Sequence, residues 1–145
     1  MEYQESQIFT EKAVNYASFG QRLGAAIIDG IIVGVVNLLL TYLLSGSILN
    51  EDGDLLPTIA SVVTGWLYGA VQESSAKQAT IGKSLLRIRV TDEQGGRISF
   101  GQASGRHFAK IISGIILFIG YLAMLWNDKK QTWHDSMAGT LVVAE

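Results

Sequence analysis

Three stretches of this chain are dominated by apolar residues, and polar segments separate them. They cover residues 19–45, 57–76 and 103–126. The first two are long enough to cross a bilayer as helices, because about 20 residues rising about 1.5 Å each span a hydrocarbon core of about 30 Å. The continuously apolar part of the third stretch, residues 111–126, is only about 24 Å long as a helix, which is marginal for a crossing. The pattern predicts an all-α integral membrane protein, a small helical bundle of about three hydrophobic helices.

The polar segments between these stretches differ in charge, and the difference predicts an orientation. The loop at residues 46–56 carries acidic residues and no Lys or Arg, whereas the connection at residues 77–102 is rich in basic residues. The basic residues are Lys77, Lys83, Arg87, Arg89 and Arg97. Because basic loops stay on the cytoplasmic side of a membrane, we expect a multi-pass protein with its N-terminus in the cytoplasm. Residues 1–18 form a polar N-terminal tail, either disordered or docked as a short helix, without the basic start and apolar core of a signal peptide.

A short β element is expected at the cytoplasmic surface. Leu86, Ile88 and Val90 alternate with polar residues, and this period of two is typical of a strand. Residues 140–143 are a second short apolar run and the natural partner strand. If the two strands pair, both ends of the third apolar stretch lie on one face and the stretch must re-enter. Re-entrant segments are rarer than full crossings, so we expect a full crossing.

Glycines recur at helix-packing spacings in the first two apolar stretches. They are Gly20, Gly24, Gly30 and Gly34 in the first stretch and Gly65 and Gly69 in the second. Small residues four positions apart allow the backbones of two membrane helices to approach closely. We expect the two glycine faces to meet, either within one chain or between the subunits of a homodimer.

Charged residues inside the apolar stretches are the candidates for function. Arg22 and Asp29 lie seven positions apart, two turns along one face of a helix. A charge in a membrane helix costs at least ~2.5 kcal/mol, so it is normally paired, hydrated or functional. Glu73 ends the second stretch, and in an antiparallel pair of helices that end lies beside Arg22. We therefore expect an Arg22–Asp29 or an Arg22–Glu73 ion pair.

Composition excludes several classes of function. The net charge of -2 and the lack of a basic, aromatic-rich cluster argue against nucleic-acid binding. The chain has no Cys, and no metal-ligand spacing or activated nucleophile is present, so we expect neither an enzyme nor a cofactor. His134 and Asp135 are adjacent, and neighbours rarely form the side-chain bond that a catalytic triad needs. Asp135 is expected instead to cap the turn into the last strand or to bind an arginine, Arg22 or Arg106.

Three ordered motifs carry a family resemblance over nearly all of residues 19–143. They are GQRLGA at residues 20–25 followed by Asp29, TIGK at residues 80–83 followed by Arg89 and Val90, and QTWHD at residues 131–135 followed by GTLVV at residues 139–143. In these motifs the chain resembles the RDD family of small bacterial membrane proteins, named for one arginine and two aspartates. The resemblance implies that Arg22, Asp29 and Asp135 are those residues. It also implies one membrane domain at residues 19–143, an inner (plasma) membrane location and a transport role, sodium/proton antiport being reported for some members.

Two readings of the buried charges lead to two classes of function. A carboxylate in a membrane can be neutralised by a proton or by a monovalent cation, and competition between them at Asp29 would give cation/proton exchange by a homo-oligomer. Alternatively, Arg22, Asp29 and Glu73 form a static polar clasp between helices. The protein would then be a non-transporting membrane scaffold or a regulatory subunit that binds another membrane protein. The ion- or proton-binding candidates are Arg22, Asp29, Glu73 and Asp135.

Overall fold

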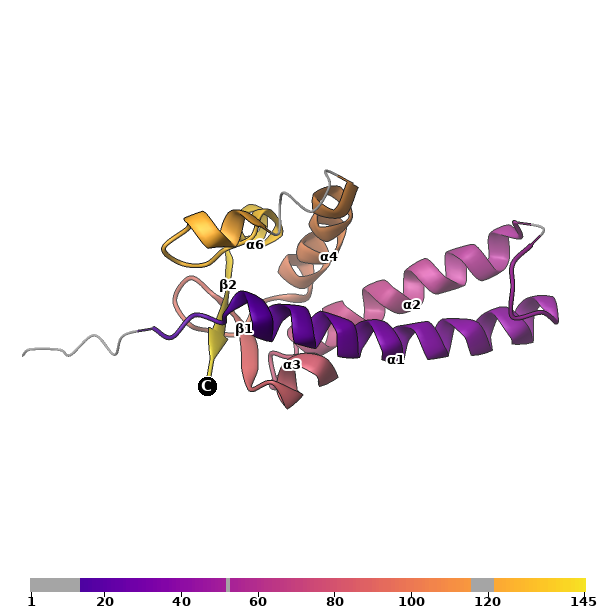
Figure 1. Cartoon of the computed structure of the whole chain (residues 1–145), viewed down its shortest axis with the longest axis horizontal. Helices are drawn as coiled ribbons and strands as arrows, with labels where there is room; N and C mark the ends of the chain where they lie inside the picture. The colour runs from indigo at the N-terminus through magenta and orange to yellow at the C-terminus, as the bar shows by residue number, and fades with distance from the viewer. Residues whose placement is uncertain (1–13, 52, 116–121) are drawn as a thin grey trace, which may run out of the picture.

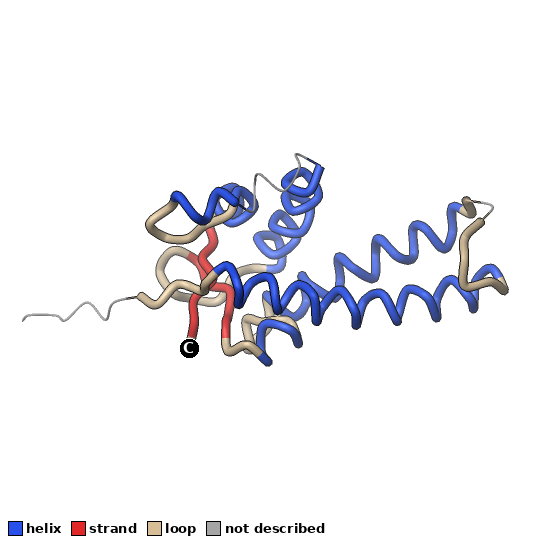
Figure 2. Tube along the Cα trace, viewed as in Figure 1, coloured by secondary structure: helices blue, strands red, loops and turns tan. Residues whose placement is uncertain are grey.

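Two long helices form a hairpin that projects from a smaller unit of short helices and strands (Figure 1). The computed structural model describes residues 14–51, 53–115 and 122–145. The hairpin consists of α1 (Phe19–Ser45) and α2 (Leu55–Glu73). The smaller unit gathers at the base of the hairpin, where α1 begins and α2 ends (Figure 2). The protein is mostly helical, with one small sheet, as the hydrophobic pattern indicates.

The bounds of α1 are those predicted, and local sequence explains both ends. Ser18 caps the first turn in a reciprocal capping box with Gln21, and Gly46 ends the helix in the left-handed conformation at φ 76°. The second helix begins at Leu55 rather than residue 57, which places Pro57 in the first turn, where its missing N–H costs nothing. Both helices are long and apolar enough to cross a membrane, at 27 and 19 residues.

The third apolar stretch is divided. It begins as α4 (Phe100–Ile115), and after residues 116–121, which lie outside the described residues, it continues as the 3-10 helix η1 (Ala123–Trp126). A further short helix, α6 (Trp133–Ala138), packs against α4. In the described parts of the chain, only α1 and α2 qualify as possible spans.

The predicted strand pairing is confirmed. Strands β1 (Ile88–Asp92) and β2 (Thr140–Ala144) are antiparallel, with Val90 opposite Val142. Ile88 and Val90 are buried and Arg89 between them is exposed, as the alternation predicts. Because β1 precedes α4 and β2 follows α6, the chain on either side of the third stretch is held at the same end of the molecule. This arrangement favours re-entry over the full crossing that we expected.

The end of the N-terminal tail docks on the sheet as an extended segment. The N–H of Ala17 donates to the carbonyl of Val142, and the N–H of Ala144 donates to the carbonyl of Asn15, at 2.9 and 2.7 Å. Tyr16 forms a β-bridge with Val143. The last tail residues are therefore neither free nor helical, and residues 1–13 lie outside the described residues.

The apolar core sits at the base of the hairpin. Its buried members are Ala17, Ala25, Ala70, Ile88, Val90, Ile98, Ala103 and Val142. Most large apolar side chains of the two long helices lie outside this core, for example Ile31, which is 63% exposed, and Leu43, which is 76% exposed. So much apolar surface is characteristic of a protein face that contacts lipid or another protein.

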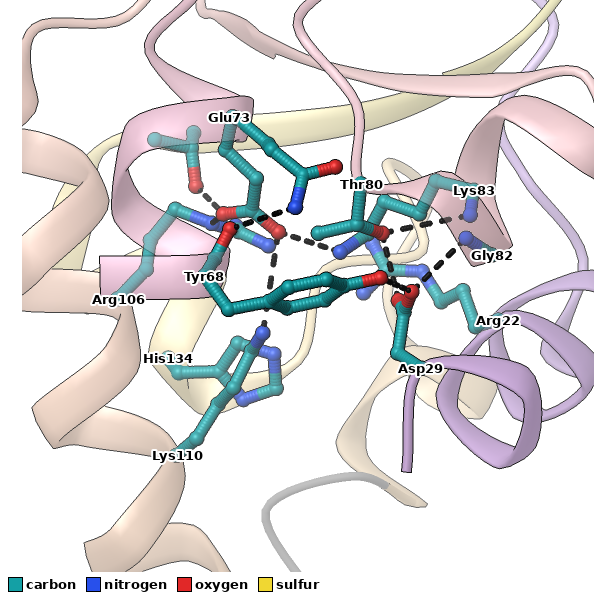
Figure 3. Close-up of polar contacts among 12 residues, drawn as sticks. Arg22, Asp29, Tyr68, Glu73, Thr80, Gly82, Lys83, Arg106, Lys110 and His134 are labelled. Carbon is teal, nitrogen blue, oxygen red and sulfur yellow. Dashed lines mark hydrogen bonds and ion pairs between the residues drawn. The ribbon is translucent and has the colours of Figure 1, made fainter. Parts of the chain in front are cut away.

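The expected contact between two glycine faces is wrong within this chain. A Cβ added at Gly30, Gly34 or Gly69 would meet nothing within 4 Å. Figure 3 shows the side chain of Tyr68 reaching from α2 to Asp29 on α1, so that this bulky ring lies between the two helices. Of the other glycines, Gly24 faces Leu86, Gly65 faces His107, and Gly20 lies near Ser18.

Candidate functional site

Asp29 is held by three neutral donors where α1 meets α2 and the chain that follows α2 (Figure 3). The hydroxyl of Tyr68 donates to Oδ1 at 2.7 Å, and the hydroxyl of Thr80 donates to Oδ2 at 2.5 Å. The backbone N–H of Gly82 also donates to Oδ1, at 2.8 Å. Among the ion pairs of the described residues, none involves Asp29, so the predicted Arg22–Asp29 pair is wrong.

The short helix α3 (Ile81–Leu85) brings two of these donors to Asp29. Thr80 is its N-cap, and the same hydroxyl accepts from the N–H of Lys83. Only glycine fits at position 82, because an added Cβ would lie 2.8 Å from Cγ of Asp29 and would also collide with the carbonyl oxygen of Ala25. The tight approach of α3 to α1 therefore depends on Gly82.

Asp135 is the centre of an ion-pair network, as one of the two predictions for it stated. Oδ2 accepts from Nη2 of Arg22 at 2.5 Å, and Oδ1 accepts from Nη1 of Arg106. The carboxylate also caps α6, because Oδ2 accepts from the N–H of Thr132 at 3.1 Å. Burial raises the pKa of Asp135, but the charges of Arg106 and Arg22 outweigh burial and hold that pKa below its usual range. Asp135 therefore remains a carboxylate throughout the physiological range.

Glu73 is fully buried in the same network. It forms ion pairs with Lys83, with Nε of Arg106 at 3.1 Å and with Nζ of Lys110 at 3.8 Å. The predicted Arg22–Glu73 pair is wrong, because Arg22 is turned to Asp135 while Glu73 faces α3 and α4. Arg106 joins the two carboxylates into one network and also donates to the hydroxyl of Thr140 at 2.6 Å.

His134 lies beside this network as a neutral side chain. Its Nε2 is 2.9 Å from the hydroxyl of Thr132 and 3.7 Å from Oδ1 of Asp135, which is too long for a hydrogen bond. Burial lowers the pKa of His134 to about 2, and the nearby Asp135 offsets only part of this shift. The ring is therefore uncharged at any physiological pH.

A cavity of about 570 Å³ connects Asp29 with the network. Arg22, Asp29, Lys83, Arg106 and Lys110 line it together with Tyr68 and Thr80. Its apolar lining includes Phe19, Leu23, Val33 and Leu122. Gly30, Gly65 and Gly69 also border the cavity, so these glycines leave space beside Asp29 rather than closing a helix contact. Of the candidates chosen from sequence, Arg22 and Asp29 face this cavity, while Glu73 and Asp135 bind the bases that line it.

Only part of this site was predictable from the sequence. Tyr68 was not among the candidates chosen from sequence, and Thr80 and Gly82 were visible only as members of a family motif. Lys83, Arg106 and Lys110 are basic residues within or beside apolar stretches, but the sequence did not show which acidic residues they bind. The described residues contain no group of three or more His, Asp or Glu side chains placed to hold a metal ion.

Comparison with known proteins places the chain in a family. The model of the RDD family matches residues 16–139. The uncharacterized protein YxaI of Bacillus subtilis is 36% identical, over 88% of this chain and 96% of that protein. The uncharacterized protein YckC of the same bacterium is 33% identical, over 87% and 83%. The proline-rich antigen homolog of Mycobacterium tuberculosis is 39% identical, over 54% of this chain and 32% of that protein. No solved structure matches the chain.

The family match covers the first two motifs completely and the third motif as far as residue 139. It includes Arg22, Asp29, Glu73 and Asp135. Together with the two long apolar helices, it indicates an association with the membrane. The chain belongs to the RDD family.

Proposed function

We propose that this protein is a membrane transport protein that exchanges a monovalent cation, Na⁺ in the first instance, for a proton at Asp29. It works in the bacterial inner (plasma) membrane as a homo-oligomer, with α1 and α2 crossing the bilayer. The basic residues after α2, at the base of the hairpin, support an orientation with this base and the N-terminus in the cytoplasm.

The observation that carries this proposal is the environment of Asp29. Its carboxylate lies within a long apolar helix and faces a cavity, yet its described partners are two hydroxyls and one N–H rather than a base. An acid that bound Arg or Lys directly would already be neutralised. Asp29 therefore has no basic partner among the described residues, and its carboxyl group is open to a proton or a cation in turn.

The hydroxyl partners suit both states of such an exchange. A hydroxyl carries one donor and two acceptor lone pairs, and its hydrogen rotates. The hydroxyls of Tyr68 and Thr80 donate to the empty carboxylate, and after rotation they can offer oxygen lone pairs to a bound cation. Hard cations prefer oxygen ligands of this kind. The backbone N–H of Gly82 keeps one carboxylate oxygen in place in either state.

The alternative function is a non-transporting scaffold or regulatory subunit. A different observation favours it: Gly30, Gly34 and Gly69 leave open space on the hairpin, and large apolar side chains along α1 are exposed. A helix of another membrane protein, or of a second copy, can pack closely at such positions. In this reading the ion-pair network is a static clasp and Asp29 only anchors α3.

Flux measurements on purified protein in liposomes distinguish these functions. The liposomes contain a pH-sensitive dye, and Na⁺, K⁺ and Li⁺ gradients are imposed in turn. The key variant is Asp29→Asn, which keeps an oxygen for Gly82 and Tyr68 and should fold, because its amide can donate to the Thr80 hydroxyl. The matched control is Asp54→Asn, which removes an exposed carboxylate that caps nothing at the far end of α2.

Exchange predicts cation-dependent proton movement in the wild type and in Asp54→Asn, and its loss in Asp29→Asn. The scaffold function predicts no movement in any of the proteins. Movement that persists in Asp29→Asn would place the exchange site elsewhere and overturn the role given to this carboxylate.

A further inference from the structure

We infer that the cavity at the base of the hairpin binds the anionic head of an amphiphile, a phosphate or carboxylate group attached to an apolar chain. Asp29 lines the same cavity, but the inference rests on the basic and apolar residues there and does not depend on whether exchange occurs at Asp29. Three features carry the inference: the surplus of positive charge, a buried donor without an acceptor, and an apolar wall that continues onto the outer surface.

Positive charge exceeds negative charge around the cavity. Arg22, Lys83, Arg106 and Lys110 all line it. Two carboxylates, Glu73 and Asp135, form ion pairs with these basic residues. Neither carboxylate lines the cavity, so both contact the basic residues from the side away from it. These four basic residues are paired with two carboxylates, and a third carboxylate, Asp29, also lines the cavity, so the basic residues outnumber the carboxylates by one. Unpaired charge in a poorly hydrated site is costly, and an anionic ligand would remove that cost.

Two of these bases have unused bonding capacity. The Nε of Arg22 is buried and has no hydrogen-bond partner among residues 14–51, 53–115 and 122–145. Lys110 has a single ion pair within the described structure, to Glu73 at 3.8 Å, which is too long for a hydrogen bond. Buried donors are normally satisfied, so a free N–H and a loosely held ammonium in one cavity point to an acceptor group from outside the chain.

The remaining lining suits an apolar chain. Phe19, Leu23 and Leu122 line the cavity and are also at least 37% exposed on the surface of the molecule. The apolar wall therefore runs from the basic end of the cavity to the outside, along the start of α1. A small inorganic anion would leave this wall bare, whereas a lipid would cover it. Basic pockets between helices on the cytoplasmic side are a known way of binding anionic lipid heads.

The test measures lipid binding to the full-length purified protein by native mass spectrometry. Dioleoyl phosphatidylglycerol is compared with dioleoyl phosphatidylcholine, which has the same chains but no net charge. The key variant is Lys110→Gln, which should fold because Glu73 keeps Lys83 and Arg106. Lys110→Arg restores the charge, and Lys77→Gln removes an exposed lysine outside this cavity as the matched control.

We expect the wild type to bind phosphatidylglycerol about fivefold tighter than phosphatidylcholine, from about fivefold for the one surplus charge. Lys110→Gln should lose about fivefold, and Lys110→Arg and Lys77→Gln should lose little. Excess inorganic phosphate that leaves the lipid bound supports a lipid ligand, whereas phosphate that displaces it supports a soluble phosphorylated ligand of the same site. Equal binding of the two lipids, or equal losses in Lys110→Gln and Lys77→Gln, would overturn the inference.

Discussion

Replacing Arg106 by Met tests whether the ion-pair network holds the base of the hairpin together. Arg106 is 1% exposed and donates to Glu73, Asp135 and Thr140. Met keeps most of the aliphatic volume, so packing changes little, while all three donated bonds are lost. Removing one partner of a buried ion pair costs about 3–5 kcal/mol, because it leaves a buried charge without compensation.

The structure places the expected cost at the lower end of that range. Asp135 keeps Arg22 and Glu73 keeps Lys83, so neither carboxylate loses its last cation. We therefore expect Arg106→Met to lower the free energy of unfolding by about 3 kcal/mol. Reversible unfolding by SDS in mixed micelles, followed by tryptophan fluorescence, measures this change.

Two further variants make the measurement specific. Arg89→Met removes an exposed arginine of β1 and should change the free energy of unfolding by less than about 0.5 kcal/mol. Asp135→Asn combined with Arg106→Met should cost less than the sum of the single changes, with a coupling of about 0.5–3 kcal/mol. Equal effects of Arg106→Met and Arg89→Met, or simple additivity in the double variant, would refute the network as a source of stability.

Two other predictions concern stability and the position of α3. Gly82→Ala should lower the free energy of unfolding by about 1–3 kcal/mol in the same SDS assay, because the new methyl group collides with Asp29. Gly69→Ala is the control: it has open space around it and should be neutral or slightly stabilising. Equal effects of the two substitutions would contradict the close approach of α3 to α1. His134 has a lowered pKa in the folded protein, so the unfolded chain binds a proton first as the pH falls below about 6.5, and stability present above that pH is lost. The loss should reach about 2 kcal/mol by pH 5 and should be absent in His134→Gln, as thermal unfolding in detergent at each pH can show.

Local sequence predicted the elements well because their ends are decided by neighbouring residues. The Ser18 capping box and the glycine at position 46 fix α1, and the alternation around Val90 identifies β1. The pairing of β1 with β2 was also predictable, since each run has one apolar face to bury. The path of the third stretch was harder to predict, because the expected strand pairing required re-entry whereas full crossings are the more common arrangement. The confirmed pairing of β1 with β2 favours re-entry.

The partners of the charged residues could not be read from the sequence. Thr80 and Gly82 reach Asp29 from 51 and 53 positions away, and Arg22 meets Asp135 across 113 positions. Each buried carboxylate has several basic residues as possible partners, and the spacing of residues within one helix does not indicate which of them it binds. For Asp135 the predicted arginine partner is confirmed, in both Arg22 and Arg106, whereas its carboxylate caps the start of α6 rather than the turn into the last strand. The glycine spacing showed where helices are able to approach but not whether a side chain such as Tyr68 keeps them apart.

The central claim is that a proton and a cation compete for Asp29. It is tested most directly by measuring proton release when NaCl is added to the purified protein in weakly buffered detergent solution with a pH indicator, using choline chloride as the control salt. We predict that the wild type releases protons as Na⁺ binds, in a saturable manner, and that Asp29→Asn releases none. Proton release that is equal in the two proteins, or Na⁺ binding without any release, would contradict exchange at this carboxylate.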